Sequence, residues 1–115
     1  MRVESILKPA IDLNNGLYHS EDILRELVSG QYQLFVSEHS ALVTTVMPYP
    51  RGTVLHLFLA GGNLEELEQL YLESEEYARY MNCKSITLSG RLGWQKTFLK
   101  EYGMKPTCLQ MSKEL

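Results

Sequence analysis

TVLHLFLAGG (residues 53–62), NLEELEQLYLESEEYARYMNC (63–83) and KSITLSG (84–90) follow one another without interruption in this chain. The outer two segments are rich in strand-forming residues, and the middle one repeats apolar residues with a helical period. A strand–helix–strand unit crosses over right-handed, so the two strands are expected to be parallel neighbours in one sheet. Ligands of such units bind beyond the carboxyl ends of the strands, near the start of the helix. The predicted small-molecule site is therefore the corner Ala60-Gly61-Gly62-Asn63, facing Gly90-Arg91.

The helix of this unit has well-defined predicted ends. Asn63 is a favourable N-cap residue, and Glu66 stands three positions later, as in a capping box. Asn82 tolerates the left-handed conformation that ends many helices. The apolar residues recur at spacings of three and four, which predicts one buried stripe: Leu64, Leu67, Leu70, Tyr71, Tyr77, Ala78 and Met81.

Length and composition indicate a single globular domain spanning residues 1–115, with 44 % hydrophobic residues. The net charge of −3 is spread along the chain, so nothing indicates a nucleic-acid-binding surface. No apolar run reaches the roughly 18–20 residues that a membrane span requires. The first 15 residues have no signal-peptide pattern, and a cytoplasmic protein is the expectation.

The cysteines and histidines do not form a recognisable metal motif. Cys83 and Cys108 are the two cysteines, and neither the CxxC arrangement nor metal-ligand spacing with a histidine is present. We therefore expect two free structural thiols and no metal.

The segments before the central unit predict a meander preceded by a short helix. Val3–Leu7 is expected to be a short edge strand interrupted by Pro9, and residues 14–16 (NNG) a turn. A helix capped by Ser20 should bury Ile23, Leu24, Leu27 and Val28 and end at Gly30. Strands are expected at residues 31–38, 41–47 and 53–60, and short connections of this kind join antiparallel neighbours.

The segment after the unit predicts a second helix and a last strand. The helix should span Trp94–Tyr102, bury Trp94, Phe98 and Leu99, and end at Gly103. Pro106 excludes further helix, and Thr107–Met111 is expected to be a strand. The resulting fold class is α/β (α+β): a mixed, mostly antiparallel sheet with a central β-α-β unit and a C-terminal α-β.

This order of elements resembles the GNAT fold of the acetyl-CoA-dependent N-acetyltransferases, over residues 31–115, about three quarters of the chain. The ending LKEYGMKPTCLQMSKEL looks like the closing pattern of that family, and SGRLGW (89–94) looks like small GNAT-like proteins encoded by tailed phages. The resemblance implies acetyl-CoA as cofactor, held at Ala60, Gly61, Gly62, Asn63 and Arg91. Fold alone does not establish activity.

The residues depart from the family's chemistry at three points. The family's phosphate loop has an Arg or Gln upstream of its glycines, and this chain has only Leu59-Ala60-Gly61-Gly62 there, followed by three glutamates. The glycine pair is therefore either a phosphate cradle or a tight strand-to-helix turn. Leu99 stands where the family has its general-acid tyrosine, so Tyr102 is the remaining candidate acid. Gly90-Arg91 replaces the asparagine that often follows the second parallel strand.

The roles of several further residues remain open from the sequence. His56 shares a strand face with Val54 and Phe58, and is either a general base or a packed sheet histidine. Glu38 and His39 lie in a turn, where solvated charge is the simpler interpretation. Arg91 is either a bidentate anion ligand or a surface ion-pair partner, and Trp94 is either part of a contact surface or an apolar anchor.

Two functions follow from these observations. The first is an acetyl-CoA-dependent N-acetyltransferase, or a divergent acyl-CoA binder with an eroded site. The second is a non-catalytic protein, phage-encoded, that acts as a virion component or a host-directed interaction module. Its protein partner would bind at the Arg91/Trp94 corner or at the sheet edge.

Overall fold

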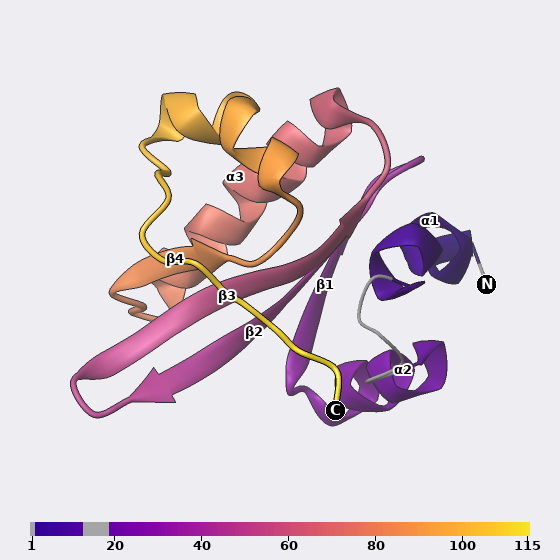
Figure 1. Ribbon diagram of the computed structural model, residues 1–115, viewed down its shortest axis with the longest axis horizontal. Coiled ribbons are helices and arrows are strands. Elements are labelled where there is room, and N and C mark those ends of the chain that lie inside the picture. Colours follow the sequence, from indigo (N-terminus) through magenta and orange to yellow (C-terminus); the bar gives the residue numbers. More distant parts are fainter. Residues whose placement is uncertain (1, 13–18) are drawn as a thin grey trace.

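The computed structural model describes residues 2–12 and 19–115 (Figure 1). Two short helices precede a four-stranded sheet, a long helix crosses between its last two strands, and two short 3-10 helices follow. In chain order these elements are α1 (Arg2–Ile11), α2 (Ser20–Ser29), β1 (Tyr32–Val36), β2 (Ala41–Tyr49), β3 (Gly52–Gly61), α3 (Leu64–Tyr80), β4 (Ser85–Leu88), η2 (Leu92–Lys96) and η3 (Phe98–Tyr102).

The sheet has the strand order β1-β2-β3-β4. The pairs β1–β2 and β2–β3 are antiparallel, and β3–β4 is parallel. This arrangement confirms the predicted α+β class, with an antiparallel meander and one parallel pair that α3 connects. The three meander strands also form where the sequence predicts them, and each strand end lies within two residues of its predicted position.

The two faces of the sheet are covered by different helices. One cluster joins Leu42, Leu55 and Leu57 of the strands to Leu67 and Leu70 of α3. The other cluster joins the strands to α1 and α2; its buried members are Leu7, Ile11, Ile23, Ala41, Val43 and Leu59. Figure 1 shows α3 and the 3-10 segments grouped apart from α1 and α2, with the sheet between them.

A β-bulge in β3 changes which of its residues face each layer. Val43 pairs with Leu59 and Thr44 pairs with Leu57, so Phe58 is an extra residue opposite β2. The extra residue reverses the alternation of side chains. Leu57 therefore packs in the α3 cluster, whereas Leu59, two positions later, packs in the cluster of α1 and α2.

Helix α3 begins and ends at the predicted residues. Asn63 is its N-cap, and the Asn63 Oδ1 atom accepts a hydrogen bond from the Glu66 backbone N–H at 2.9 Å. Asn82 adopts φ 57°, the left-handed conformation expected after the helix. The predicted buried stripe is confirmed in its middle, where Leu67, Leu70, Tyr71 and Ala78 are buried. Leu64 and Met81, at its ends, are exposed.

The N-terminal prediction is wrong: Val3–Leu7 belongs to helix α1, not to a strand. The apolar positions 3, 6, 7, 10 and 11 form a helical stripe, and Leu7 and Ile11 are buried on it. Pro9 lies at an exposed position inside the helix, which continues past it to Ile11. The turn predicted at residues 14–16 lies outside the described residues.

Helix α2 buries a narrower face than predicted. Ile23 is buried and Leu27 is half-buried, but Leu24 is 48 % and Val28 81 % exposed. Its N-cap is His19 rather than Ser20. The predicted C-cap is confirmed, because Gly30 takes φ 87° and its N–H donates to the Leu27 carbonyl oxygen.

The predicted helix Trp94–Tyr102 is instead two 3-10 segments separated by Thr97. The Thr97 Oγ1 atom donates to the Trp94 carbonyl oxygen at 2.7 Å and accepts from the Leu99 N–H at 3.4 Å. The side chain of Thr97 thus closes one turn and caps the next. Leu99 is buried and Gly103 adopts φ 90°, both as predicted.

The last predicted strand, Thr107–Met111, does not form. Residues 105–115 have no helix or strand and are exposed, and Leu109 and Met111 are 75 % and 82 % exposed. Figure 1 shows this segment in yellow, running from η3 toward α2. Alternating side chains predict a strand only where a backbone partner is available, and none of the described strands pairs with this one.

Candidate functional site: a groove between diverging strands

Strands β3 and β4 diverge toward their carboxyl ends. Their paired residues run from Val54–Ser85 to Leu57–Leu88. The Ser89 N–H still donates to the Leu57 carbonyl oxygen at 3.0 Å, and the chain then turns into η2. Strand β3 continues to Gly61, and over this stretch β2 is the one strand that pairs with it among the described strands. Residues 58–60 therefore present the β4 side of their backbone to an open slot, and such an edge binds extended, amide-bearing groups.

Two hollows open along this slot. The first, of about 210 Å³, lies between the strand ends; it is lined by Ala10, Leu42, Leu57, Phe58, Leu59, Ala60, Leu88, Ser89, Gly90, Arg91 and Trp94. The second, of about 360 Å³, lies against the start of α3; it is lined by Ile6, Pro9, Ala60, Gly61, Gly62, Leu64, Leu67, Arg91 and Trp94. Because Ala60, Arg91 and Trp94 line both, we treat the two hollows as one groove.

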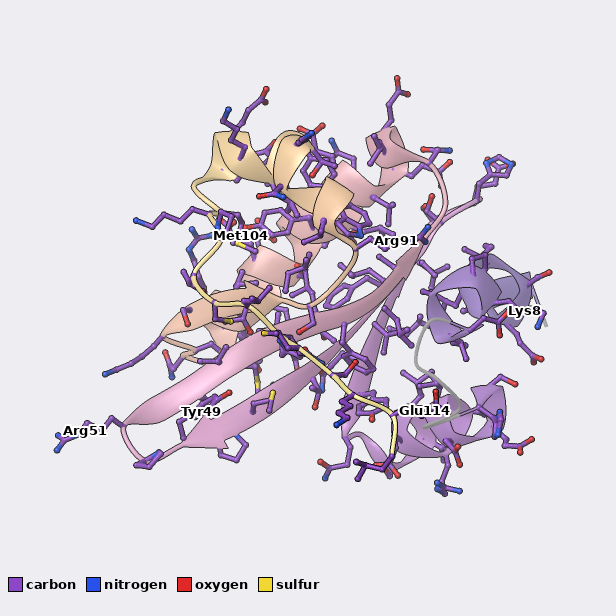
Figure 2. The ribbon with its side chains drawn as sticks, viewed as in Figure 1. Lys8, Tyr49, Arg51, Arg91, Met104 and Glu114 are labelled. Carbon is purple, nitrogen blue, oxygen red and sulfur yellow. The ribbon has the colours of Figure 1, made fainter. Side chains whose placement is uncertain are left out.

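The structure brings together four of the five residues predicted to bind a cofactor. Ala60, Gly61, Gly62 and Arg91 line the groove. Figure 2 shows Arg91 beside the carboxyl-terminal half of β3. Asn63 is not among the lining residues, and its side chain caps α3 instead. Arg91 is exposed and is the one charged side chain among the described lining residues, so the groove favours an anionic ligand group.

The glycine pair is required by packing inside the protein. A Cβ atom on Gly61 would lie 2.3 Å from the Ile6 carbonyl oxygen of α1. A Cβ atom on Gly62 would lie 2.1 Å from Ser40 Oγ, and Gly62 has φ 121°, which favours glycine. These contacts support the interpretation of Gly61-Gly62 as a tight strand-to-helix turn.

Glu66 binds the β1–β2 turn to the start of α3. Its carboxylate accepts hydrogen bonds from the Ser37 hydroxyl and from the His39 N–H (2.8 Å) and lies 3.1 Å from His39 Nδ1. The same carboxylate accepts from Asn63 Nδ2 at 2.9 Å. The hydrogen bonds from Ser37, the His39 backbone and Asn63 lower the pKa of Glu66 to about 2. His39, predicted to be a solvated turn residue, is therefore part of this network.

We expect Glu66→Gln to lower the melting temperature at neutral pH, because the amide replaces a charged acceptor by a weaker one. The folded-state pKa of about 2 lies below the ordinary value of 4.5, so the carboxylate stabilises the fold above pH 4.5. That contribution is lost as the pH falls from 4.5 through 2. At pH 7 the wild-type protein should therefore melt at a higher temperature than Glu66→Gln. This difference in melting temperature should shrink as the pH falls from 4.5 to 2.

The matched control for this prediction is Glu65→Gln, which removes a carboxylate from the same exposed helical turn. It should change the melting temperature much less than Glu66→Gln does. A wild-type advantage over Glu66→Gln that stays constant from pH 7 to pH 2 would contradict the assigned role.

Tyr102 lies away from the groove. Its hydroxyl donates to Glu68 Oε2 at 2.6 Å, and its ring packs against Tyr71 and Phe98. The hydrogen bond to Glu68 raises the pKa of Tyr102. Tyr102 is not among the residues that line either hollow, so the structure does not bring this candidate acid to the other predicted site residues.

A polar cluster at the mouth of the first hollow was not predicted. His56 Nδ1 lies 2.7 Å from Thr87 Oγ1, and His56 Nε2 lies 3.1 Å from Ser89 Oγ. His56 pairs with Thr87 in the parallel register, and Thr87 and Ser89 are two residues apart. The imidazole thus bridges the hydroxyl group of Thr87 in β4 and that of Ser89, which directly follows β4. This contact depends on how residues of β3 and β4 pair, which cannot be read from the sequence.

The divergent β3–β4 pair, with α3 crossing between the two strands, defines a GNAT-like fold, as the sequence resemblance implies. Solved structures with related folds include the tetramutant of the BH1408 protein from Bacillus halodurans. That protein has a TM-score of 0.70 and 13 % identity, with 99 % of this chain and 92 % of that chain covered.

Two named acetyltransferases are similar in fold as well. A Trypanosoma brucei acetyltransferase has a TM-score of 0.63 and 15 % identity, covering 97 % of this chain and 94 % of that chain. Glucosamine-6-phosphate N-acetyltransferase from Arabidopsis thaliana has a TM-score of 0.64 and 14 % identity, covering 96 % and 89 %. No protein-family model and no curated protein sequence matches this chain.

Other site types receive no support from the described residues. Across residues 2–12 and 19–115, no group of three or more His, Cys, Asp or Glu side chains could hold a metal ion. Cys83 is half-buried and Cys108 is exposed, and both are free. Among the described helices, none has the length and apolar character needed to span a membrane.

The groove fits the acyl-pantetheine arm of coenzyme A better than it fits the diphosphate. The open backbone edge at residues 58–60 and the apolar walls fit an extended acyl-pantetheine arm. A backbone cradle for the diphosphate fits less well, because Gly61 and Gly62 pack against Ile6 and Ser40 and Asn63 caps the Glu66 N–H. Arg91 is the cation that lines the groove and could bind a phosphate.

Proposed function

We propose that this protein binds acetyl-CoA or a related acyl thioester in the groove and transfers the acyl group to an amine. The observation that supports this most is the divergence of β3 and β4 after Leu57, which opens the first hollow between their carboxyl ends. When bound, the coenzyme supplies an activated acyl group. The backbone of residues 58–60 would hydrogen-bond the amides of the arm, and the apolar lining, including Trp94, would exclude water.

A thermal-shift titration with acetyl-CoA tests this proposal. A ligand that binds only the folded state stabilises it by RT ln(1 + [L]/Kd), so the melting temperature should rise with ligand concentration. The Kd obtained from this rise should agree with the Kd from calorimetry. Acetyl-pantetheine, which lacks the diphosphate and the nucleotide, should also raise it. No shift with either ligand at millimolar concentration would refute the proposal.

Arg91→Ala should weaken acetyl-CoA binding about tenfold, because a charge-assisted hydrogen bond contributes about 1.5–3 kcal/mol and exposure reduces this. Its affinity for acetyl-pantetheine should stay the same, since that ligand has no phosphate. Arg51→Ala, at the β2–β3 turn that Figure 2 shows far from the groove, is the matched control and should bind both ligands normally. Equal weakening toward both ligands would contradict the phosphate role.

A non-catalytic protein-interaction role, in a virion or on a host protein, is the second candidate. Within the described chain, β4 pairs with β3 alone, so its outer edge is open to another strand. Leu92, beside the Arg91/Trp94 corner, is 78 % exposed. Leu109 and Met111 of the C-terminal segment are exposed to a similar degree. An intact fold that binds neither acetyl-CoA nor acetyl-pantetheine would favour this candidate.

A further inference from the structure

We propose that Ser89 and His56 form a nucleophile–base pair, and that the Ser89 hydroxyl accepts an acyl group from an ester or thioester in the first hollow. This inference deepens the proposed function by naming the residue that accepts the acyl group and the base that activates it. The choice of a thioester as the donor rests on the proposed function. The pair itself rests on the geometry of β3 and β4.

The distances are those of an activated hydroxyl. Ser89 Oγ lies 3.1 Å from His56 Nε2, within hydrogen-bond reach, and Thr87 Oγ1 lies 2.7 Å from His56 Nδ1. When Nδ1 carries the proton and donates it to Thr87, Nε2 is free to accept the Ser89 proton. Thr87 then acts as a positioning residue, in the way that a third group orients the base in other nucleophile–base pairs.

The environment keeps the imidazole in its base form. His56 is half-buried, and this burial lowers its pKa, which favours the neutral ring. Its ring also stacks on Phe58, with the centroids 6.3 Å apart and the planes 7° from parallel. Two side-chain contacts and one stacked ring fix the orientation of the ring toward Ser89.

Ser89 is accessible where an acyl donor would lie. It is exposed and lines the hollow between the strand ends. The apolar residues that line the same hollow, including Leu57, Leu88 and Trp94, would exclude water from the acyl group. A nucleophile and its base are thus present at one end of the groove.

The step balances without a further reactant. Ser89 Oγ attacks the carbonyl carbon, a new C–O bond forms, and the Ser89 proton passes to His56 Nε2. The bond from the carbonyl carbon to the leaving sulfur or oxygen then breaks, and His56 returns the proton to the leaving group. An amine or water attacks the acyl-serine in turn and gives its proton to His56, which returns it to Ser89 Oγ.

The probe is p-nitrophenyl acetate, which needs no coenzyme. The full chain carries Cys108→Ala, because that exposed thiol would react with the ester. Intact mass should show one acetyl group, and peptide mapping should place it on Ser89. Ser89→Ala should abolish this label. His56→Gln should slow it at least tenfold at an unchanged melting temperature, because a general base typically contributes more than that.

Thr87→Val should slow the labelling by a smaller factor than His56→Gln. Ser85→Ala, which removes an exposed hydroxyl from the same strand, is the matched control and should label normally. Acetylation spread over lysines, or Ser89 labelling at the same rate without His56, overturns the proposal. Because the ester test omits acetyl-CoA, its outcome is independent of whether the coenzyme binds.

Discussion

Gly61→Ala is expected to destabilise the fold by about 3 kcal/mol, the upper part of the range for overpacking a tightly packed site. The added methyl group would lie 2.3 Å from the Ile6 carbonyl oxygen and 3.1 Å from the Ile6 carbonyl carbon. Both are backbone atoms, so the strain can be relieved only by moving α1 away from β3. The midpoint of urea unfolding should fall while the slope of the transition stays the same.

Gly93→Ala is the control for this substitution, because a Cβ atom there meets nothing within 4 Å and no left-handed φ is required. It should change stability by less than about 0.5 kcal/mol. If Gly61→Ala proved as stable as Gly93→Ala, α1 would not pack on the end of β3 as described. For the same reason, alanine at Gly61 or Gly62 is a poor probe of ligand binding, since it alters the fold first.

Leu70→Ala is expected to cost about 2–5 kcal/mol of unfolding free energy, the range for a buried leucine. Leu70 is 1 % exposed and belongs to the cluster in which α3 packs on Leu55 and Leu57 of β3. The truncation leaves a cavity between the helix and the sheet, which close packing cannot fill. Chemical denaturation monitored by circular dichroism measures the loss.

Leu64→Ala removes the same atoms from the first turn of the same helix, where the side chain is 53 % exposed. Its cost should be below about 1 kcal/mol, since little apolar area leaves the core. Equal costs for the two substitutions would mean that the buried face of α3 is not the one described.

Local signals in the sequence predicted most of the fold. Asn63, Gly30, Asn82 and Gly103 each end or start a helix for a reason that acts within a few residues, and all four predictions are confirmed. The handedness of crossover connections then predicted the parallel pair of β3 and β4. These signals need no knowledge of distant contacts.

One error arose where the outcome depends on a distant partner, and two where local signals conflict. The prediction for Val3–Leu7 gave too much weight to Pro9 and too little to the helical spacing of the apolar residues around it. Thr107–Met111 has the composition of a strand but no paired neighbour in the described chain. Thr97 has a hydroxyl that competes with helical hydrogen bonds, which divides the last helix in two.

The candidate site was predictable only in part, because one of its contacts depends on how two distant strands pair. The crossover rule brings Gly61 and Gly62 near Arg91, and all three line the groove. The contact between His56 and Ser89 depends on the register of two strands separated by 33 positions in the chain. A one-residue shift of that register would turn the side chains of β4 to the other face.

Strand β3 joins the two layers of the protein through one continuous backbone. Leu57 and Leu59 are rigidly linked through the backbone, yet each is buried among the residues of a different layer. Loss of order in either layer releases a strand on which the other layer packs. Opening of α1 and α2 is therefore coupled energetically to opening of α3, and amide hydrogen exchange in β3 should require both layers to open together.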